Sequence, residues 1–221
     1  MLMMIRILPL LFLITSCALF KSEPNLLSKD KMELLNSIKL IGEGRGRIAL
    51  GESNYVFGVD SFLKENTDWV LAVQIPLQGE EALILPNLKQ KIQPQHEIES
   101  FEERITDEFK KRKLDRSVSS KTFIKEMRSL VRFVLAPEWG KKHNCEERQS
   151  ELFCDLDGEK FHIVIEEKEI SIIRPLGEKK FLVLSGRNLT KSIFAQTDIR
   201  LYTNGMDRKK KNSSFSLELF W

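Results

Sequence analysis

Two different periods of apolar residues divide this chain of 221 residues, and they constrain its fold more than any other feature. In residues 45–94 and again in residues 151–221, apolar and polar side chains alternate, which is typical of β-strands with one buried face. In residues 96–136 the apolar side chains recur every three or four positions, which is the spacing of an amphipathic helix. The sequence therefore predicts two blocks of strands separated by helices.

The alternating segments predict roughly eleven strands, five before the helices and six after them. Turn signals such as Asp157-Gly158 and Asn204-Gly205 separate the later strands and favour long antiparallel hairpins. Hairpins of this kind under two covering helices predict an α+β fold that is mainly β, a half-open antiparallel β-barrel whose hollow suits an apolar ligand. The predicted strands cover residues 45–50, 53–63, 68–76, 81–86, 87–94, 151–156, 159–167, 169–175, 179–187, 192–203 and 213–221.

Two helices are predicted between the strand blocks, and a short one is predicted at residues 26–38. Ser119 and Ser120 are suitable N-caps for the second central helix, and Pro137 ends it. Apolar stripes of this kind usually pack on a core, which here would be the sheet. The two stripes consist of Ile98, Phe101, Ile105 and Phe109 in the first helix and of Phe123, Met127, Leu130, Val131 and Val134 in the second.

The chain begins with an apolar run at residues 7–20, preceded by a single charge at Arg6. A transmembrane helix needs about 20 apolar residues, so this run is short for a permanent span and is typical of a signal peptide. The run contains Ile14-Thr15-Ser16-Cys17, which resembles the bacterial lipobox. This resemblance implies cleavage after Ser16 and a diacylglycerol on the sulfur of Cys17. The alternative is a buried N-terminal helix with an incidental cysteine.

The lipobox interpretation divides the chain into a signal peptide (residues 1–16), a lipidated tether (residues 17–25) and a single domain (residues 26–221). Two or three acyl chains hold a protein firmly at a membrane, because each buried methylene contributes about 0.8 kcal/mol. Ala18 stands where bacterial inner-membrane lipoproteins often carry Asp, which by resemblance favours the periplasmic face of the outer membrane. The remaining domain is long enough to bury a sizeable core.

The charge balance does not require a nucleic-acid partner. The chain has 35 Lys and Arg against 32 Asp and Glu, a net charge of +3, which becomes +2 when Arg6 is removed with the signal peptide. The basic runs at residues 110–113 and 208–211 are short, and each is more typical of a solvated helix face or turn than of a binding patch.

Cys145 and Cys154 form an even pair once Cys17 is assigned to lipid. An exported chain folds in an oxidising compartment, which favours a disulfide that closes a small loop between the helical segment and the next strand. The alternative is a metal site with His143 and His162. Neither spacing matches a known zinc pattern, so no metal is expected.

No motif in the sequence predicts catalysis or a cofactor. The chain contains neither a GxSxG nucleophile elbow nor an HExxH zinc motif, and its three histidines lie in different segments. The glycine-rich stretch at residues 42–47 leads into a strand rather than a helix. A bulge or a close approach of two backbones is therefore a better interpretation than a phosphate loop. The chain is predicted not to be an enzyme.

The order of these features resembles the LolB family, the outer-membrane lipoprotein receptors of the lipoprotein-sorting pathway. The lipobox is followed by a helix, then by a strand with Arg-Gly-Arg at residues 45–47 and its hairpin partner. The next strand ends in Pro76-Leu77-Gln78-Gly79, where the family has Pro-Leu-Gly, and two helices and a second antiparallel block follow. The extra Gln78, the cysteine pair and the basic turn depart from the family pattern and leave both a general receptor and a specialised relative open.

The resemblance implies a monomer that binds the acyl chains of client lipoproteins in an apolar hollow, receives them from a soluble periplasmic carrier of the LolA type, and inserts them into the outer membrane. The loop Pro76-Leu77-Gln78-Gly79 would enter the bilayer during release, and the alternative is that Leu77 folds under the loop onto the sheet. The residues expected to line the hollow, or else to fill an ordinary core, are Ile48, Leu50, Phe57, Val59, Leu71, Val73, Phe161, Ile163 and Val183. A second hypothesis is a structural or assembly lipoprotein of the envelope that binds another protein instead of lipid.

Overall fold

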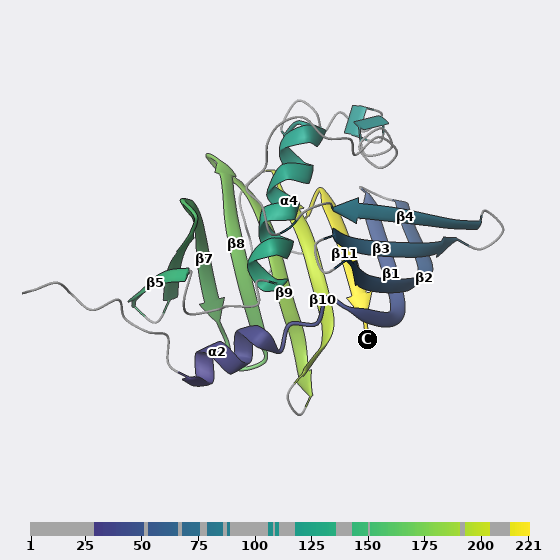
Figure 1. The fold of residues 1–221 in the computed structure, drawn as a ribbon. Coiled ribbons are helices and arrows are strands. Elements are labelled where there is room, and N and C mark those ends of the chain that lie inside the picture. Colours follow the sequence, from purple (N-terminus) through teal and green to yellow (C-terminus); the bar gives the residue numbers. More distant parts are fainter. Residues whose placement is uncertain are drawn as a thin grey trace, which may run out of the picture.

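The computed structural model describes residues 29–50, 53–65, 68–75, 79–85, 88, 106–107, 109–110, 118–135, 143–149, 151–190, 193–203 and 213–221. Eleven strands form one sheet, and two helices lie against it (Figure 1). The helices are α2 (Lys29–Asn36) and α4 (Ser120–Leu135). The strands are β1 (Gly42–Leu50), β2 (Ser53–Lys64), β3 (Asp68–Ile75), β4 (Gly79–Leu85), β5 (His143–Arg148), β6 (Glu151–Leu156), β7 (Glu159–Ile165), β8 (Glu169–Gly177), β9 (Lys180–Thr190), β10 (Ile193–Tyr202) and β11 (Phe215–Phe220).

The strand order in the sheet is β4-β3-β2-β1-β11-β10-β9-β8-β7-β6-β5. All neighbours are antiparallel, and every pair except β1 with β11 joins strands that follow each other in the sequence. The edges are β4 and β5, so the sheet is open, as the expected half-open barrel requires. Figure 1 shows β3 and β4 running across the direction of β8 to β10, so the sheet is strongly curved.

One face of the sheet, called here the inner face, carries the main apolar core together with the helices. The predicted stripe of α4 packs on it, because Phe123, Met127, Leu130, Val131 and Val134 are all buried. At the start of α4, the backbone N–H of Thr122 donates to Oγ of Ser119 at 3.2 Å. This is the N-cap that the sequence predicts, and it satisfies one of the free amides of the first turn.

The residues after α2 cross one end of the inner face and join its two sides. The carbonyl of Ser37 accepts a hydrogen bond from the N–H of Phe194 in β10, at 3.1 Å. The carbonyl of Leu40 accepts from Oγ of Ser61 in β2 at 2.6 Å and from Nε1 of Trp69 in β3 at 3.0 Å. Since Leu40 and Trp69 are almost completely buried, this crossing segment closes the core at that end.

The glycines of β1 make room for their neighbours. A Cβ on Gly46 would lie 2.1 Å from the ring of Phe57 in β2, so the phenyl ring occupies the place of a side chain. A Cβ on Gly44 would lie 2.1 Å from the backbone oxygen of Phe220 in β11. The prediction of a close backbone approach in this stretch is therefore confirmed.

Ten of the eleven strands in the described residues were predicted, and β5 was not. The strand expected at residues 87–94 lies outside the described residues except for Leu88, which is a buried turn residue. The eleventh strand is β5, which the sequence analysis assigned to a loop. The first central helix lies mostly outside the described residues, although Thr106, Asp107, Phe109 and Lys110 are helical.

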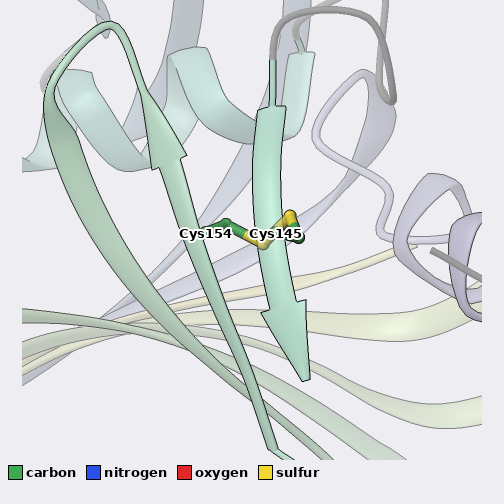
Figure 2. Close-up of a disulfide and its surroundings, with 2 residues drawn as sticks. All are labelled: Cys145 and Cys154. Atoms are coloured by element: carbon green, nitrogen blue, oxygen red, sulfur yellow. A yellow bond between two sulfur atoms is a disulfide. The ribbon is translucent and has the colours of Figure 1, made fainter. Parts of the chain in front are cut away.

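Cys145 and Cys154 form a disulfide, as predicted, with their Cα atoms 4.0 Å apart (Figure 2). The two residues are directly opposite each other in β5 and β6. The bond therefore pins an edge strand to its neighbour, rather than closing an irregular loop before a strand. Both cysteines are buried and belong to the core of the inner face.

Candidate functional site

The inner face is the candidate site, because most of the residues predicted to line an apolar hollow meet there. The cluster that holds them also contains residues of α4, which lies in front of β8 and β9 in Figure 1. The side chain of Leu50 lies outside the described residues. The predicted residues that belong to this cluster or pack against it are Ile48, Phe57, Val59, Leu71, Val73, Phe161 and Ile163.

Val183 does not belong with the others. Successive side chains of a strand point to opposite faces, and in β9 the inner face is taken by Leu182 and Leu184. Val183 therefore lies on the other face of the sheet, called here the outer face, in a small cluster with Val164, Ile173 and Tyr202. The sequence could not distinguish the two faces, because four consecutive apolar residues of β9, at positions 181–184, fit either phase of the alternation.

Aromatic side chains connect α4 to the sheet. Phe133 of α4 stacks on Phe161 of β7 with ring centroids 4.1 Å apart. At the other end of the helix, Phe123 meets the edge of the ring of Phe215 in β11 at 5.0 Å. Phe109 packs on Phe123 at 5.3 Å. Both ends of the contact between α4 and the sheet are therefore made by aromatic side chains.

Ion pairs lie at the rim of this apolar contact. Nε of Arg174 in β8 is 2.5 Å from Oε2 of Glu126 in α4, and its guanidinium also lies 5.0 Å from the centre of the Phe161 ring. Arg132 of α4 pairs with Asp157 in the turn between β6 and β7. These pairs fix the position of the helix on the sheet, because directional contacts resist sliding and apolar contacts do not.

Arg128 carries a positive charge on the buried side of α4. Burial, and then the neighbouring Arg132, lower the pKa of its guanidinium. The carboxylates of Glu159 in β7 and Asp68 in β3 act in the opposite sense and favour the charged form. These two carboxylates come from strands that are far apart in the order of the sheet.

The outer face carries a chain of charged side chains that the sequence analysis missed. Nη2 of Arg200 donates to Oδ2 of Asp198 and to Oε1 of Glu218, both at 2.9 Å. Glu218 also pairs with Arg47 in β1, and Asp198 lies 3.3 Å from Nη1 of Arg187. Arg187 also pairs with Glu169 at 3.1 Å. The network therefore contains three arginines (Arg47, Arg187 and Arg200) and three carboxylates (Glu169, Asp198 and Glu218).

Burial dominates the electrostatics of this network. It raises the pKa of Asp198, and the nearby Glu218 adds to the effect, whereas Arg200, a hydrogen bond from Gln196 and Arg187 act against it. A sequence signal was present, since charged residues occupy alternate positions in the otherwise apolar strand ends at residues 198–202 and 217–220. In a strand with both faces buried, such residues mark the outer face.

Several predicted functional residues lie outside the described residues, namely Cys17, Pro76, Leu77, Gln78 and the basic run at residues 208–211. Gly79 is described and is exposed at the start of β4, with a φ of 99°. Within the described part of the chain, no group of three or more His, Cys, Asp or Glu side chains is arranged to hold a metal ion. None of the described helices is long and apolar enough to cross a bilayer.

Comparisons of the chain with protein-family models, curated proteins and solved structures find no match. The resemblance to the LolB family therefore rests on the sequence features alone, and the function that it implies is a proposal.

Proposed function

We propose that this chain is a lipid-anchored envelope protein that binds the acyl chains of client lipoproteins between α4 and the inner face of the sheet and helps to insert them into the outer membrane. The observation that supports the proposal is the interface itself, which is mainly apolar, with ion pairs at its rim and one buried charge at Arg128. An acyl chain needs such a surface, because it must stay out of water from donor to acceptor. No covalent bond is made or broken in this function.

Uptake of an acyl chain requires a change at this interface. Leu71, Phe161 and Ile163 are at most 2% exposed, so a ligand can reach them only if apolar side chains move apart. The helix is the element that can move at the lower cost, because the strands are held by continuous hydrogen-bonded ladders. An acyl chain would then replace the apolar contacts of α4, and the ion pairs of the rim and the surroundings of the buried Arg128 would change.

A crosslink between α4 and the sheet tests this proposal. The variant Cys17→Ala with Glu126→Cys and Arg174→Cys places two thiols at positions whose native side chains touch. One sample is treated with a bismaleimide, and the control is the same variant capped with N-ethylmaleimide. Binding of a fluorescent diacylated lipopeptide is measured in both. We expect the capped domain to bind the lipopeptide and the crosslinked domain to lose binding.

The two contrary results have different meanings. If both samples bind equally well, lipid does not enter beneath α4. If neither binds while circular dichroism shows a folded domain, the lipid-binding proposal is wrong and the alternative of an assembly protein gains support.

A further inference from the structure

Exposed apolar side chains gather at the end of the sheet where the segment after α2 crosses. This group, called here the end patch, comprises Ile41, Leu189, Ile193 and Phe220, which are 37%, 36%, 50% and 39% exposed, together with the half-buried Trp221. Scattered apolar residues are normal on a protein surface, but several at one end of a sheet favour a contact there. The four exposed members come from three separate parts of the chain, so the fold rather than the sequence brings them together.

The most exposed part of the end patch is the hairpin of β9 and β10, which extends beyond both neighbouring strands. At this end, β8 stops pairing with β9 at Arg187, and β11 stops pairing with β10 at Gln196. The pairs Leu189 with Phe194 and Thr190 with Ile193 lie beyond these points, with no third strand beside them in the described structure. Figure 1 shows this hairpin projecting past α2.

The base of the hairpin is firmly held. Phe194 is 1% exposed, and its ring packs closely on Gly186 of β9. A Cβ added to Gly186 would lie 2.7 Å from this ring. The backbone N–H of Phe194 donates to Ser37, and the N–H of Trp221 donates to the carbonyl of Ala195 at 3.0 Å. The tip is therefore presented by a rigid support rather than by a loose loop.

Trp221 and Lys39 give the patch the chemistry of a membrane interface. Nζ of Lys39 lies 5.1 Å from the centre of the Trp221 ring, and Nε1 of Trp221 donates to Oγ1 of Thr197 at 3.2 Å. Tryptophan is enriched where a bilayer meets water, and lysine places its stem on apolar surface with the charge towards the head groups. Beyond the patch, the exposed Glu43 and Asp60 make the surface acidic, which limits the contact to a shallow one.

Two observations favour a bilayer over a protein as the occupant. Leu189 lies beside Phe194 and Ile193 beside Thr190, so the two exposed aliphatic side chains point to opposite faces of the hairpin. A tip that is apolar on both sides suits immersion, whereas a protein partner covers one side. The predicted tether of residues 17–25 precedes α2 in the sequence, and it spans at most about 30 Å when extended. The residue that follows α2, Ser37, bonds to the base of this hairpin.

We infer that the end patch rests on the phospholipid bilayer that holds the acyl chains of Cys17, with Leu189 and Ile193 of the β9–β10 hairpin entering the head-group region. This orientation depends on the proposed lipid anchor. The lipid anchor alone would keep the domain near the membrane, and the contact at the end patch would also fix its orientation.

The test uses the mature chain with a hexahistidine tag in place of Cys17, held on vesicles of phosphatidylethanolamine, phosphatidylglycerol and a nickel-chelating lipid. An environment-sensitive fluorophore is attached at Ile193→Cys. The control carries it at Glu178→Cys, because Glu178 is exposed in the turn that joins β8 to β9, at the other end of β9 from Thr190. We expect a blue shift and quenching by spin-labelled acyl chains at position 193 and neither at position 178.

Either of two results overturns the inference: a fluorophore at position 193 that stays in water, or an equal response at both positions. Lipopeptide binding by the same labelled chains in solution separates this inference from the proposed function. Binding without membrane contact at position 193 refutes the orientation alone, and membrane contact without binding refutes the acyl-chain proposal alone.

Discussion

Asp198 in β10 and Glu218 in β11 lie directly opposite each other on the outer face of the sheet, and one guanidinium, that of Arg200, bonds to both carboxylates. The side chain of Asp198 is completely buried and that of Glu218 is 6% exposed. Like charges at directly opposite positions of a sheet repel each other. The centre of the sheet therefore depends on Arg200 to hold β10 and β11 together at this position.

Replacing this arginine is expected to destabilise the domain strongly. Arg200→Gln leaves two buried carboxylates facing each other without their shared cation, and breaking a buried pair in this way costs about 3–5 kcal/mol. Urea unfolding of the Cys17→Ala domain measures the free energy of unfolding. The control is Arg148→Gln, which removes an exposed pair with Glu146 and should leave the midpoint unchanged. Equal effects of the two substitutions would mean that the network does not stabilise the sheet.

The raised pKa of Asp198 predicts a pH dependence of stability. A carboxyl group whose pKa is higher in the folded chain than in the unfolded chain binds its proton more readily when folded. Its contribution to stability is therefore complete below the ordinary carboxyl pKa and is lost as the pH rises through the raised value. We expect the urea midpoint to fall across this window, and Asp198→Asn to flatten that part of the profile. An unchanged profile in the variant would assign the pH dependence to other groups.

The fold and the site differ in how far the sequence predicts them. The position of α4 and ten of the strands follow from periodicity, because an amphipathic stripe such as Phe123 to Val134 or an alternation such as Phe57 to Val59 has only one face to bury. The strand β5 was missed because its sequence, HNCEER, contains no apolar alternation. It is a strand because β6 supplies its hydrogen bonds and Cys145 joins it covalently to Cys154.

The outer face could not be predicted, because it depends on the register between strands that are distant in the sequence. Arg47 and Glu218 are 171 positions apart and pair only because β1 lies beside β11. The same limitation explains the error at Val183, since alternation within one strand does not indicate which phase faces the helices. Most of the predicted lining residues were correctly grouped, because their strands alternate without ambiguity.

The disulfide is expected to stabilise the edge of the sheet. Replacing both Cys145 and Cys154 with Ala should lower the free energy of unfolding by about 2–3 kcal/mol, because the bond closes a loop of about ten residues in the unfolded chain. Thiol counting on the denatured, unreduced Cys17→Ala domain should find no free thiol. Two free thiols in that assay would show that the bond does not form in the purified protein.

Lipid anchoring is expected to depend on Cys17. The acyl chains supply nearly all of the membrane affinity of a lipoprotein, so Cys17→Ala should release the protein from membranes washed in high salt. Cell fractionation followed by immunoblotting measures this release. Retention of the variant in the membrane fraction would contradict the lipobox interpretation, and Ser16→Thr, which keeps the cysteine, is a suitable control for processing.

The loop at Leu77 is expected to act during delivery. Leu77→Glu should leave folding and lipopeptide binding intact while slowing transfer into vesicles, because a carboxylate resists entry into an apolar layer, whereas a leucine gains about 1.5–3 kcal/mol there. The control is Gln78→Glu, which adds the same charge at the neighbouring polar position. If Leu77→Glu unfolds the domain, the side chain belongs to the core, and if transfer is normal, the loop is not the delivery device.

The pairing of β1 with β11 also has a consequence for biogenesis. The first strand of the domain finds its central partner only in the last strand, so the middle of the sheet cannot form until the final residues of the sequence are present. Contacts over such long separations are entropically costly to close and form slowly. If the chain is exported as we propose, this delay would help to keep it unfolded while it crosses the membrane.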